Sequence, residues 1–278
     1  MNISTQKEAP DGALVRSDLE RLSAAEVRAH IRAGRWPHTT KRLALGREQA
    51  NLVILEERYA FDFMRFCLRN PKSLPLMEVT DPGDPEPKRV APGADLRTDV
   101  PAYCLYREGR FVEEMSDIRD LWRPDHVAFL TGCNLSVDQV MLDAKIPLPH
   151  LVDEDARASQ YISNMACEPA GIFAGPVVAS MRPIPKELVV KVIEITSRYP
   201  QCHGGPIHVG DPAAIGIDDI GRADWGKANP IGPDQVPVFW ACGVTAQAVA
   251  QASKIPEMIT HASGHLFVTD LALLDPVK

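Results

Sequence analysis

The sequence lacks the patterns that would place this protein in a membrane or on a nucleic acid. No apolar run approaches the roughly 18 residues that a membrane-spanning helix requires. The first twelve residues, MNISTQKEAPDG, are polar and contain no apolar core of a signal peptide. A net charge of −7 argues against a nucleic-acid backbone or an anionic membrane as partner. We therefore expect a cytoplasmic protein with no nucleic-acid partner and no membrane partner.

Paired cysteines and glycine-rich nucleotide motifs are also missing. The six cysteines are scattered without a C-x-x-C pair, so we expect reduced thiols and no disulfide framework. No G-x-G-x-x-G or Walker motif occurs, and we expect no cofactor. What remains is an ordinary globular composition, 45% hydrophobic and 24% charged, in a chain of 278 residues. That length suits one large domain or two smaller ones.

Strand-like and helix-like segments alternate along the chain, which favours an α/β fold. The patterns predict helices over residues 17–34, 48–69, 136–144, 185–199 and 245–254. They predict a hairpin over 102–114 and strands over 175–184, 205–211, 236–244 and 265–274. The helix between the strands at 175–184 and 205–211 suggests a parallel pair with a right-handed crossover.

We expect a two-part fold, with a mixed sheet flanked by helices and a smaller inserted β-α-β domain. The main domain would contain residues 1–150 together with 228–278, and the inserted domain residues 151–227.

Two segments repeat one local pattern, an apolar run followed by Cys-x-x-Ser/Thr and a helix. The residues are Cys133 with Ser136, and Cys242 with Thr245. Free N–H groups at a helix start attract anions, and their positive potential lowers the pKa of a nearby thiol. We expect both corners at one end of one sheet, where they would grip a substrate with two carboxylates. The structural alternative is that the hydroxyls cap helices and the cysteines only pack.

Two arginines are candidate carboxylate ligands, because a guanidinium binds a carboxylate through two parallel hydrogen bonds. Arg182 ends an apolar strand-like run, and Arg97 lies in a loop rich in Pro and Gly. Each has a structural alternative, a salt bridge for Arg182 and a solvated loop charge for Arg97.

The histidines offer acid/base chemistry near neutral pH, and His208 and His265 are the preferred candidates. A metal-dependent hydrolase or lyase is the alternative. Its candidate ligands are His203, His208, Asp211, His261 and His265. Turn residues separate both histidine pairs, so we expect no bound metal.

Long segments of the chain resemble a bacterial hydro-lyase family related to the vertebrate mitochondrial D-glutamate cyclase. The segments that carry the resemblance are RTDVPAY, LWRPDHVAFLTGC, GPVVASMRPI, HGGPIHVGDPAAIGI, VPVFWACGVTAQ and ITHASGHLFVTD. The resemblance implies a two-part α/β fold and a carbon–oxygen lyase. For the cyclase relatives it implies conversion of D-glutamate to 5-oxo-D-proline with loss of water. Relatives tend to have G-C-S-F-S-F-E where this chain has GCNLSVD, which alters Asn134 and Asp138.

The sequence therefore predicts a hydro-lyase for a small acidic metabolite, with D-glutamate cyclisation as the first reaction to test. The predicted catalytic residues are His208, His265, Cys133 and Cys242. The predicted substrate-binding residues are Arg182, Ser136, Thr245 and Arg97. A non-catalytic binder of a small dicarboxylate is a second alternative, and the sequence leaves a homo-oligomer open.

Overall fold

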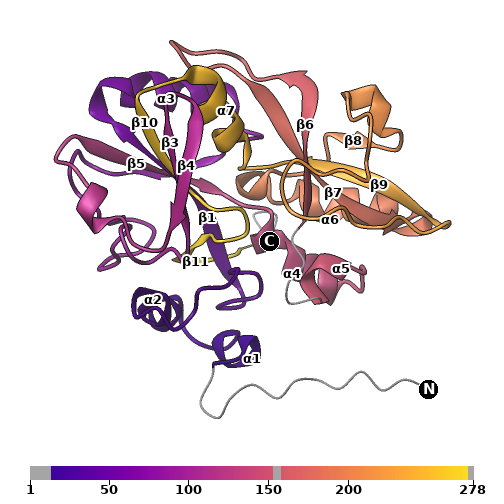
Figure 1. Cartoon of the computed structure of the whole chain (residues 1–278). Helices are drawn as coiled ribbons and strands as arrows, with labels where there is room; N and C mark the ends of the chain where they lie inside the picture. The colour runs from indigo at the N-terminus through magenta and orange to yellow at the C-terminus, as the bar shows by residue number, and fades with distance from the viewer. Residues whose placement is uncertain (1–13, 153–157, 275–278) are drawn as a thin grey trace.

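The computed structural model describes residues 14–152 and 158–274. The polar first twelve residues, where we found no signal-peptide core, lie outside the described residues. Among the described residues, no helix is long and apolar enough to cross a membrane. The chain forms two sheets side by side, with helices around them (Figure 1).

The larger sheet has seven strands in the order β2-β5-β1-β10-β3-β4, with β11 paired to β1. Their bounds are β1 Arg47–Glu56, β2 Leu76–Val79, β3 Tyr103–Arg107, β4 Arg110–Met115, β5 His126–Gly132, β10 Glu257–His261 and β11 Phe267–Ala272. Every pairing is antiparallel, and β3 and β4 form the predicted hairpin.

The predicted helix over 48–69 is wrong in its first half. Residues 48–55 belong to β1 and are all buried, because β1 lies inside the sheet with both faces covered. A strand buried on both faces loses the alternation that identifies it in a sequence. Only α3, Glu57–Arg69, is helical there.

The smaller sheet has four antiparallel strands in the order β6-β7-β9-β8. Their bounds are β6 Ser159–Ala166, β7 Pro176–Pro185, β8 His208–Val209 and β9 Gln235–Ala241. β7 and β8 run in the same direction, as predicted, but they are not hydrogen-bonded to each other, because β9 lies between them and runs antiparallel to both. Although we predicted that residues 228–278 belong with the main part, β9 joins the smaller sheet. The domain division itself stays a prediction.

Helices flank both sheets and complete the predicted two-part α/β fold. Their bounds are α1 Arg16–Leu19, α2 Ala24–Arg32, α4 Leu135–Asp143, α5 Pro149–Val152, α6 Val189–Ser197 and α7 Thr245–Ser253. Four short 3₁₀ turns lie at Arg119–Leu121, Lys186–Leu188, Pro200–Cys202 and Pro212–Ile215. The predicted helix over 17–34 is interrupted at Ser23, which caps α2 in a capping box with Glu26.

The helices α4 and α7 connect the two sheets reciprocally. Helix α4 follows β5 of the larger sheet, but its Val137 belongs to the apolar cluster that contains Trp240 of the smaller sheet. Helix α7 follows β9 of the smaller sheet and contacts β7, but its Val249 belongs to the apolar cluster that contains Phe129 of the larger sheet. Each strand-to-helix corner therefore lies where the sheets meet (Figure 1).

Candidate active site

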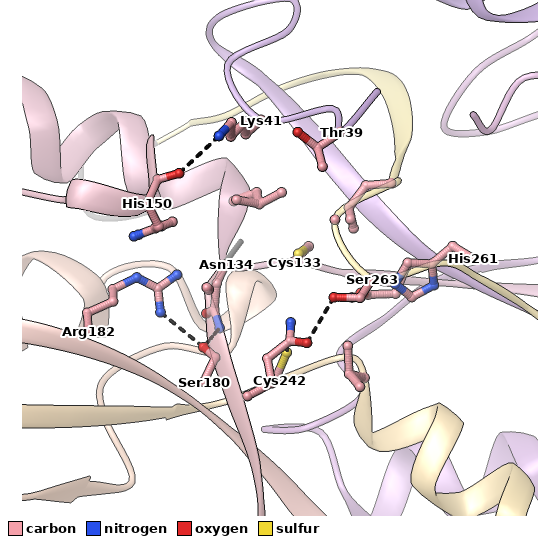
Figure 2. A pocket seen from close by; sticks show the side chains of 17 residues that line it. Thr39, Lys41, Cys133, Asn134, His150, Ser180, Arg182, Cys242, His261 and Ser263 are labelled. Atoms are coloured by element: carbon pink, nitrogen blue, oxygen red, sulfur yellow. Dashed lines mark hydrogen bonds between the residues drawn. The ribbon is translucent and has the colours of Figure 1, made fainter. Parts of the chain in front are cut away.

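The two predicted corners meet at one pocket between the sheets. Cys133 follows β5, Cys242 follows β9, and both cysteines line this pocket (Figure 2). Our expectation that both corners share one end of one sheet is wrong, since β5 and β9 belong to different sheets. They come together because α4 and α7 each cross to the opposite sheet.

The two corner hydroxyls hold the framework rather than line the pocket. Ser136 Oγ accepts a hydrogen bond of 2.8 Å from the backbone N–H of Gln49 in β1. Thr245 Oγ1 accepts one of 3.0 Å from the backbone N–H of Val178 in β7. Ser136 thus ties the start of α4 to β1, the neighbour of β5, and Thr245 ties the start of α7 to β7, the neighbour of β9. Neither hydroxyl caps its own helix, so the capping alternative is wrong, and the substrate contacts of Ser136 and Thr245 stay predictions.

Both pocket thiols have raised pKa values, opposite to the lowering that we expected at a helix start. Burial raises the pKa of Cys133 well above its usual value, although a backbone hydrogen bond from Leu135 opposes the shift. Burial also raises the pKa of Cys242, against a backbone hydrogen bond from Val244. Because the corners are covered by both sheets, desolvation outweighs the helix-start N–H groups.

Arg182 projects from β7 into a buried network. Its Nε and Nη2 donate to the two carboxylate oxygens of Asp138 at 3.0 and 3.1 Å. Its Nη1 donates to Ser180 Oγ at 3.0 Å, and its guanidinium lies 5.0 Å from the Trp240 ring centre. The planar fork that we assigned to a substrate carboxylate is therefore engaged by Asp138. What Arg182 offers the pocket is a positive charge and one side of its guanidinium.

Asp138 also orients a histidine that our sequence prediction did not include. His150 Nε2 lies 3.0 Å from Asp138 Oδ2. Burial alone would raise the pKa of Asp138, but Arg182 and His150 together lower it below its usual value. The ionised carboxylate accepts from Nε2–H, which leaves Nδ1 as the basic nitrogen. Burial lowers the pKa of His150, and Nδ1 is buried without a hydrogen-bond partner among the described residues.

A second neutral imidazole lies on the opposite side of the pocket. His261 Nδ1 accepts from the Leu52 backbone N–H at 3.1 Å, a shorter contact than the 3.3 Å to the Leu52 carbonyl. Burial lowers the pKa of His261 to about 4, so the ring is neutral at pH 7 with its proton on Nε2. That nitrogen is buried and finds no partner within the described part of the chain. Figure 2 shows His150 and Arg182 on one side of the cysteines and His261 and Ser263 on the other.

Asn134 stands between these two sides. Its Nδ2 donates to the Ala241 carbonyl at 2.9 Å and to Ser180 Oγ at 3.3 Å. Its Oδ1 is buried and lacks a hydrogen-bond partner in the described chain. With His150 Nδ1 and His261 Nε2, three pocket residues therefore carry unsatisfied polar atoms. Buried polar groups in native proteins are nearly always paired, so these three atoms suit a polar ligand or ordered water in the pocket.

Besides Ser136 and Thr245, three further predicted site residues lie outside this pocket. His208 lies in β8 beside an open groove, and its Nε2 contacts the Asp211 carbonyl at 2.7 Å. Arg97 is engaged by Asp95 through bonds of 2.9 and 2.8 Å, in agreement with a structural role in the loop. His265 is buried, and its Nδ1 contacts the Ser263 carbonyl at 3.0 Å. The residues on either side of His265 line the pocket, but its own side chain does not.

The five residues of the metal-dependent alternative are not gathered into one site. His203 Nδ1 contacts the Lys72 carbonyl at 2.9 Å, and His208 lies beside the open groove. His261 alone among the five lines the pocket. Over the described residues, no group of three or more His, Cys, Asp and Glu side chains is placed to hold a metal ion.

Polar residues within apolar, strand-like segments indicate pocket residues, and our sequence prediction included only some of them. Arg182 was noted, but Ser180, two residues earlier on the same face of β7, was not. Asn51 in the middle of β1 also lines the pocket. His150 carries no such signal, because its role depends on a carboxylate twelve residues earlier that only the folded chain brings close.

Comparisons with known proteins agree with the resemblance found in the sequence. The family described as D-glutamate cyclase matches residues 127–270. "Putative hydro-lyase" of Rubrobacter xylanophilus is 52% identical over 247 residues, which cover 89% of this chain and 95% of that protein. "Putative hydro-lyase YcsI" of Bacillus subtilis is 48% identical over 250 residues, which cover 90% and 97%. A nitrogen repressor-like protein from Methanococcus jannaschii aligns at a TM-score of 0.37 and 12% identity, over 88% of this chain and 97% of that one. This similarity is too weak to establish a shared fold. The chain belongs to the D-glutamate cyclase family.

Proposed function

We propose that the protein is a hydro-lyase that removes water from a small acidic metabolite, and that it cyclises D-glutamate to 5-oxo-D-proline. The observation that supports this most is the pocket between the sheets. It places an oriented base, His150 Nδ1, opposite a neutral donor, His261 Nε2, and both are buried without protein partners among the described residues. The family and its hydro-lyase relatives support the lyase class.

The electrostatics of the pocket favour a carboxylate ligand. Lys41 contributes a buried positive charge, and its Nζ donates to the His150 carbonyl at 3.1 Å. The charge of Asp138 is already matched by Arg182. Helices α4 and α7 both start at the pocket, and helix starts stabilise negative charge. A dicarboxylic amino acid would place its α-carboxylate against these positive groups.

The same residues supply the steps of ring closure. His150 Nδ1 takes a proton from the α-ammonium group, and the resulting imidazolium is stabilised by Asp138. The free amine attacks the γ-carboxylate carbon and forms the ring C–N bond, and the second proton of the ring nitrogen passes to one γ-oxygen, which becomes the departing hydroxyl. His261 Nε2–H donates to the oxyanion that develops at that carbon. The proton held on His150 then passes to the departing hydroxyl, which leaves as water while the carbonyl re-forms.

Incubation of the purified protein with D-glutamate, followed by NMR, tests this proposal. We expect 5-oxoproline to form above the spontaneous rate, and we expect L-glutamate to react more slowly. Replacement of His150 by Gln should lower kcat by about 10²- to 10⁴-fold, the usual contribution of a general base. His208→Gln is the matched control, because its ring lies outside the pocket.

Other outcomes separate the alternatives. Dehydration of a different small diacid would keep the hydro-lyase class and overturn the D-glutamate assignment. Thermal stabilisation by D-glutamate without turnover would instead favour a non-catalytic binder.

We also propose that the protein is cytoplasmic, since the six cysteines are all free thiols.

A further inference from the structure

The two corners are equivalent in their bonding as well as in their sequence. In each, a backbone hydrogen bond reaches the thiol from two residues later, from Leu135 to Cys133 and from Val244 to Cys242. In each, the hydroxyl three residues after the cysteine accepts a neighbouring strand's N–H, and the helix packs on the opposite sheet. The pocket therefore lies between two copies of the same strand–Cys-x-x-Ser/Thr–helix corner.

Two asparagines, Asn134 of the first corner and Asn51 of β1, connect the two corners. Asn134 reaches across to the Ala241 carbonyl, one residue before Cys242. In the other direction, Asn51 Nδ2 donates at 2.6 Å to the Gly132 carbonyl, one residue before Cys133. Asn51 also fills the space beside Gly243, where an added Cβ would lie 2.1 Å from Asn51 Cγ. These contacts fix both cysteines against the same small pocket.

We propose that this pair of thiols also exchanges the α-hydrogen of the bound α-amino or lactam carboxylate and inverts its α-carbon. The inference rests on the proposed function for the kind of ligand that the pocket holds. One cysteine first gives its proton to the pocket base, His150 Nδ1. The resulting thiolate removes the α-proton, and the C–H bonding electrons move into the carboxylate as an enediolate. The thiol of the other cysteine returns a proton to the opposite face. The product is the mirror-image centre, with the thiol and thiolate exchanged and no redox change.

Three features of the pocket suit this step. The enediolate carries two negative oxygens, which the positive groups and the two helix starts would stabilise. Burial makes each thiolate a stronger base than a thiolate in water. Gln160 Nε2 lies 3.7 Å from Cys242 Sγ and is itself held by Ser263, so this sulfur has a donor that supports its charged form.

Deuterium exchange tests the proposal without reference to dehydration. The intact protein is incubated in D₂O with 5-oxo-D-proline, with D-glutamate and with the enantiomer of each. Loss of the α-proton is followed by NMR, and inversion by chiral chromatography. We expect both processes above the rate without protein for at least one of these ligands.

Serine variants of the two thiols supply the specific signature. Cys133→Ser and Cys242→Ser should each lower inversion by about 10²-fold or more. Each variant should still exchange deuterium into one enantiomer, and the preferred enantiomer should differ between the two. Cys167→Ser is the matched control, because this buried cysteine does not line the pocket. A merely structural role would not give opposite enantiomer preferences.

The possible failures are distinguishable. Ligands that raise the melting temperature of the wild type but never gain deuterium would overturn this inference and leave the dehydration proposal intact. Deuterium gain without water loss would support this inference and overturn the cyclase. Equal enantiomer preference in the two folded serine variants, checked by circular dichroism, would also contradict the two-thiol scheme.

Discussion

At the residue scale, buried histidines couple stability to pH. Burial lowers the pKa of both His203 and His261 to about 4. His126 and His150 contribute, because burial lowers their pKa values too. In the unfolded chain each histidine titrates near 6.5, so between pH 6.5 and 4 the unfolded state binds protons that the folded state does not. Their contribution to stability is therefore complete above pH 6.5 and is lost as the pH falls toward 4.

We predict that the free energy of unfolding falls with pH across this window, on the order of 3 kcal/mol for each of His203 and His261. Urea unfolding at several pH values between 4 and 7 measures the slope. His261→Asn should make the slope shallower, because one of these imidazoles is gone. His208→Asn, in the open groove, is the control that should leave the slope unchanged. An unaltered slope in folded His261→Asn would show that His261 takes up its proton as readily in the folded protein.

Arg182 shows what a residue-level prediction can and cannot reach. An arginine at the end of an apolar strand predicted a ligand for a substrate carboxylate, with a salt bridge as the alternative, and the structure has a buried ion pair with Asp138. The identity of that partner was not predictable, because Asp138 lies 44 residues earlier and on α4. Only the crossing of α4 to the smaller sheet turns a candidate substrate ligand into a buried ion pair.

At the element scale, the strand-to-helix corners were found from sequence, but their setting was not. Cys-x-x-Ser/Thr after an apolar run located both helix starts to within a residue or two. Local sequence carries no information about which sheet each strand joins, since that depends on long-range pairing. For the same reason β1 was mistaken for a helix, and β10, which flanks it in the larger sheet, was not predicted at all.

The corner hydroxyls give the element-scale prediction. Thr245→Val keeps the shape of the side chain but leaves the Val178 N–H buried without its acceptor, which should cost about 1–3 kcal/mol. Thr245→Ser keeps the hydroxyl and should cost less. Denaturant midpoints of the two variants measure the difference. Because the corner also positions Cys242, the valine variant should lose activity beyond its loss of stability. Equal stability of the valine and serine variants would mean that the hydrogen bond from Val178 to Thr245 does not stabilise this corner.

At the scale of the whole molecule, α4 and α7 each pack toward the sheet that they do not follow, so both sheets contribute residues to the pocket. Neither sheet carries the site alone, because the first supplies Cys133 and the second supplies Cys242 and Arg182. Apolar clusters on α4 and α7 fix each corner to the opposite sheet. A ligand bound between the corners would therefore contact residues on both sides and stabilise both at once.

This coupling predicts the pattern of hydrogen exchange on ligand binding. Saturation with 5-oxo-D-proline, or with D-glutamate in a His150→Gln variant that turns over slowly, should slow amide exchange at residues 134–138 and at 243–247 together. Local opening of either corner would break the same set of ligand contacts, so both openings become less favourable by a similar free energy. Peptides from β4, the edge strand of the larger sheet, are the internal control, because none of its residues lines the pocket. Exchange measured by mass spectrometry with and without ligand gives both values in one experiment. Protection confined to one corner would show that the ligand binds one sheet only, and the acid/base arrangement across the pocket would then have to be rebuilt on that side.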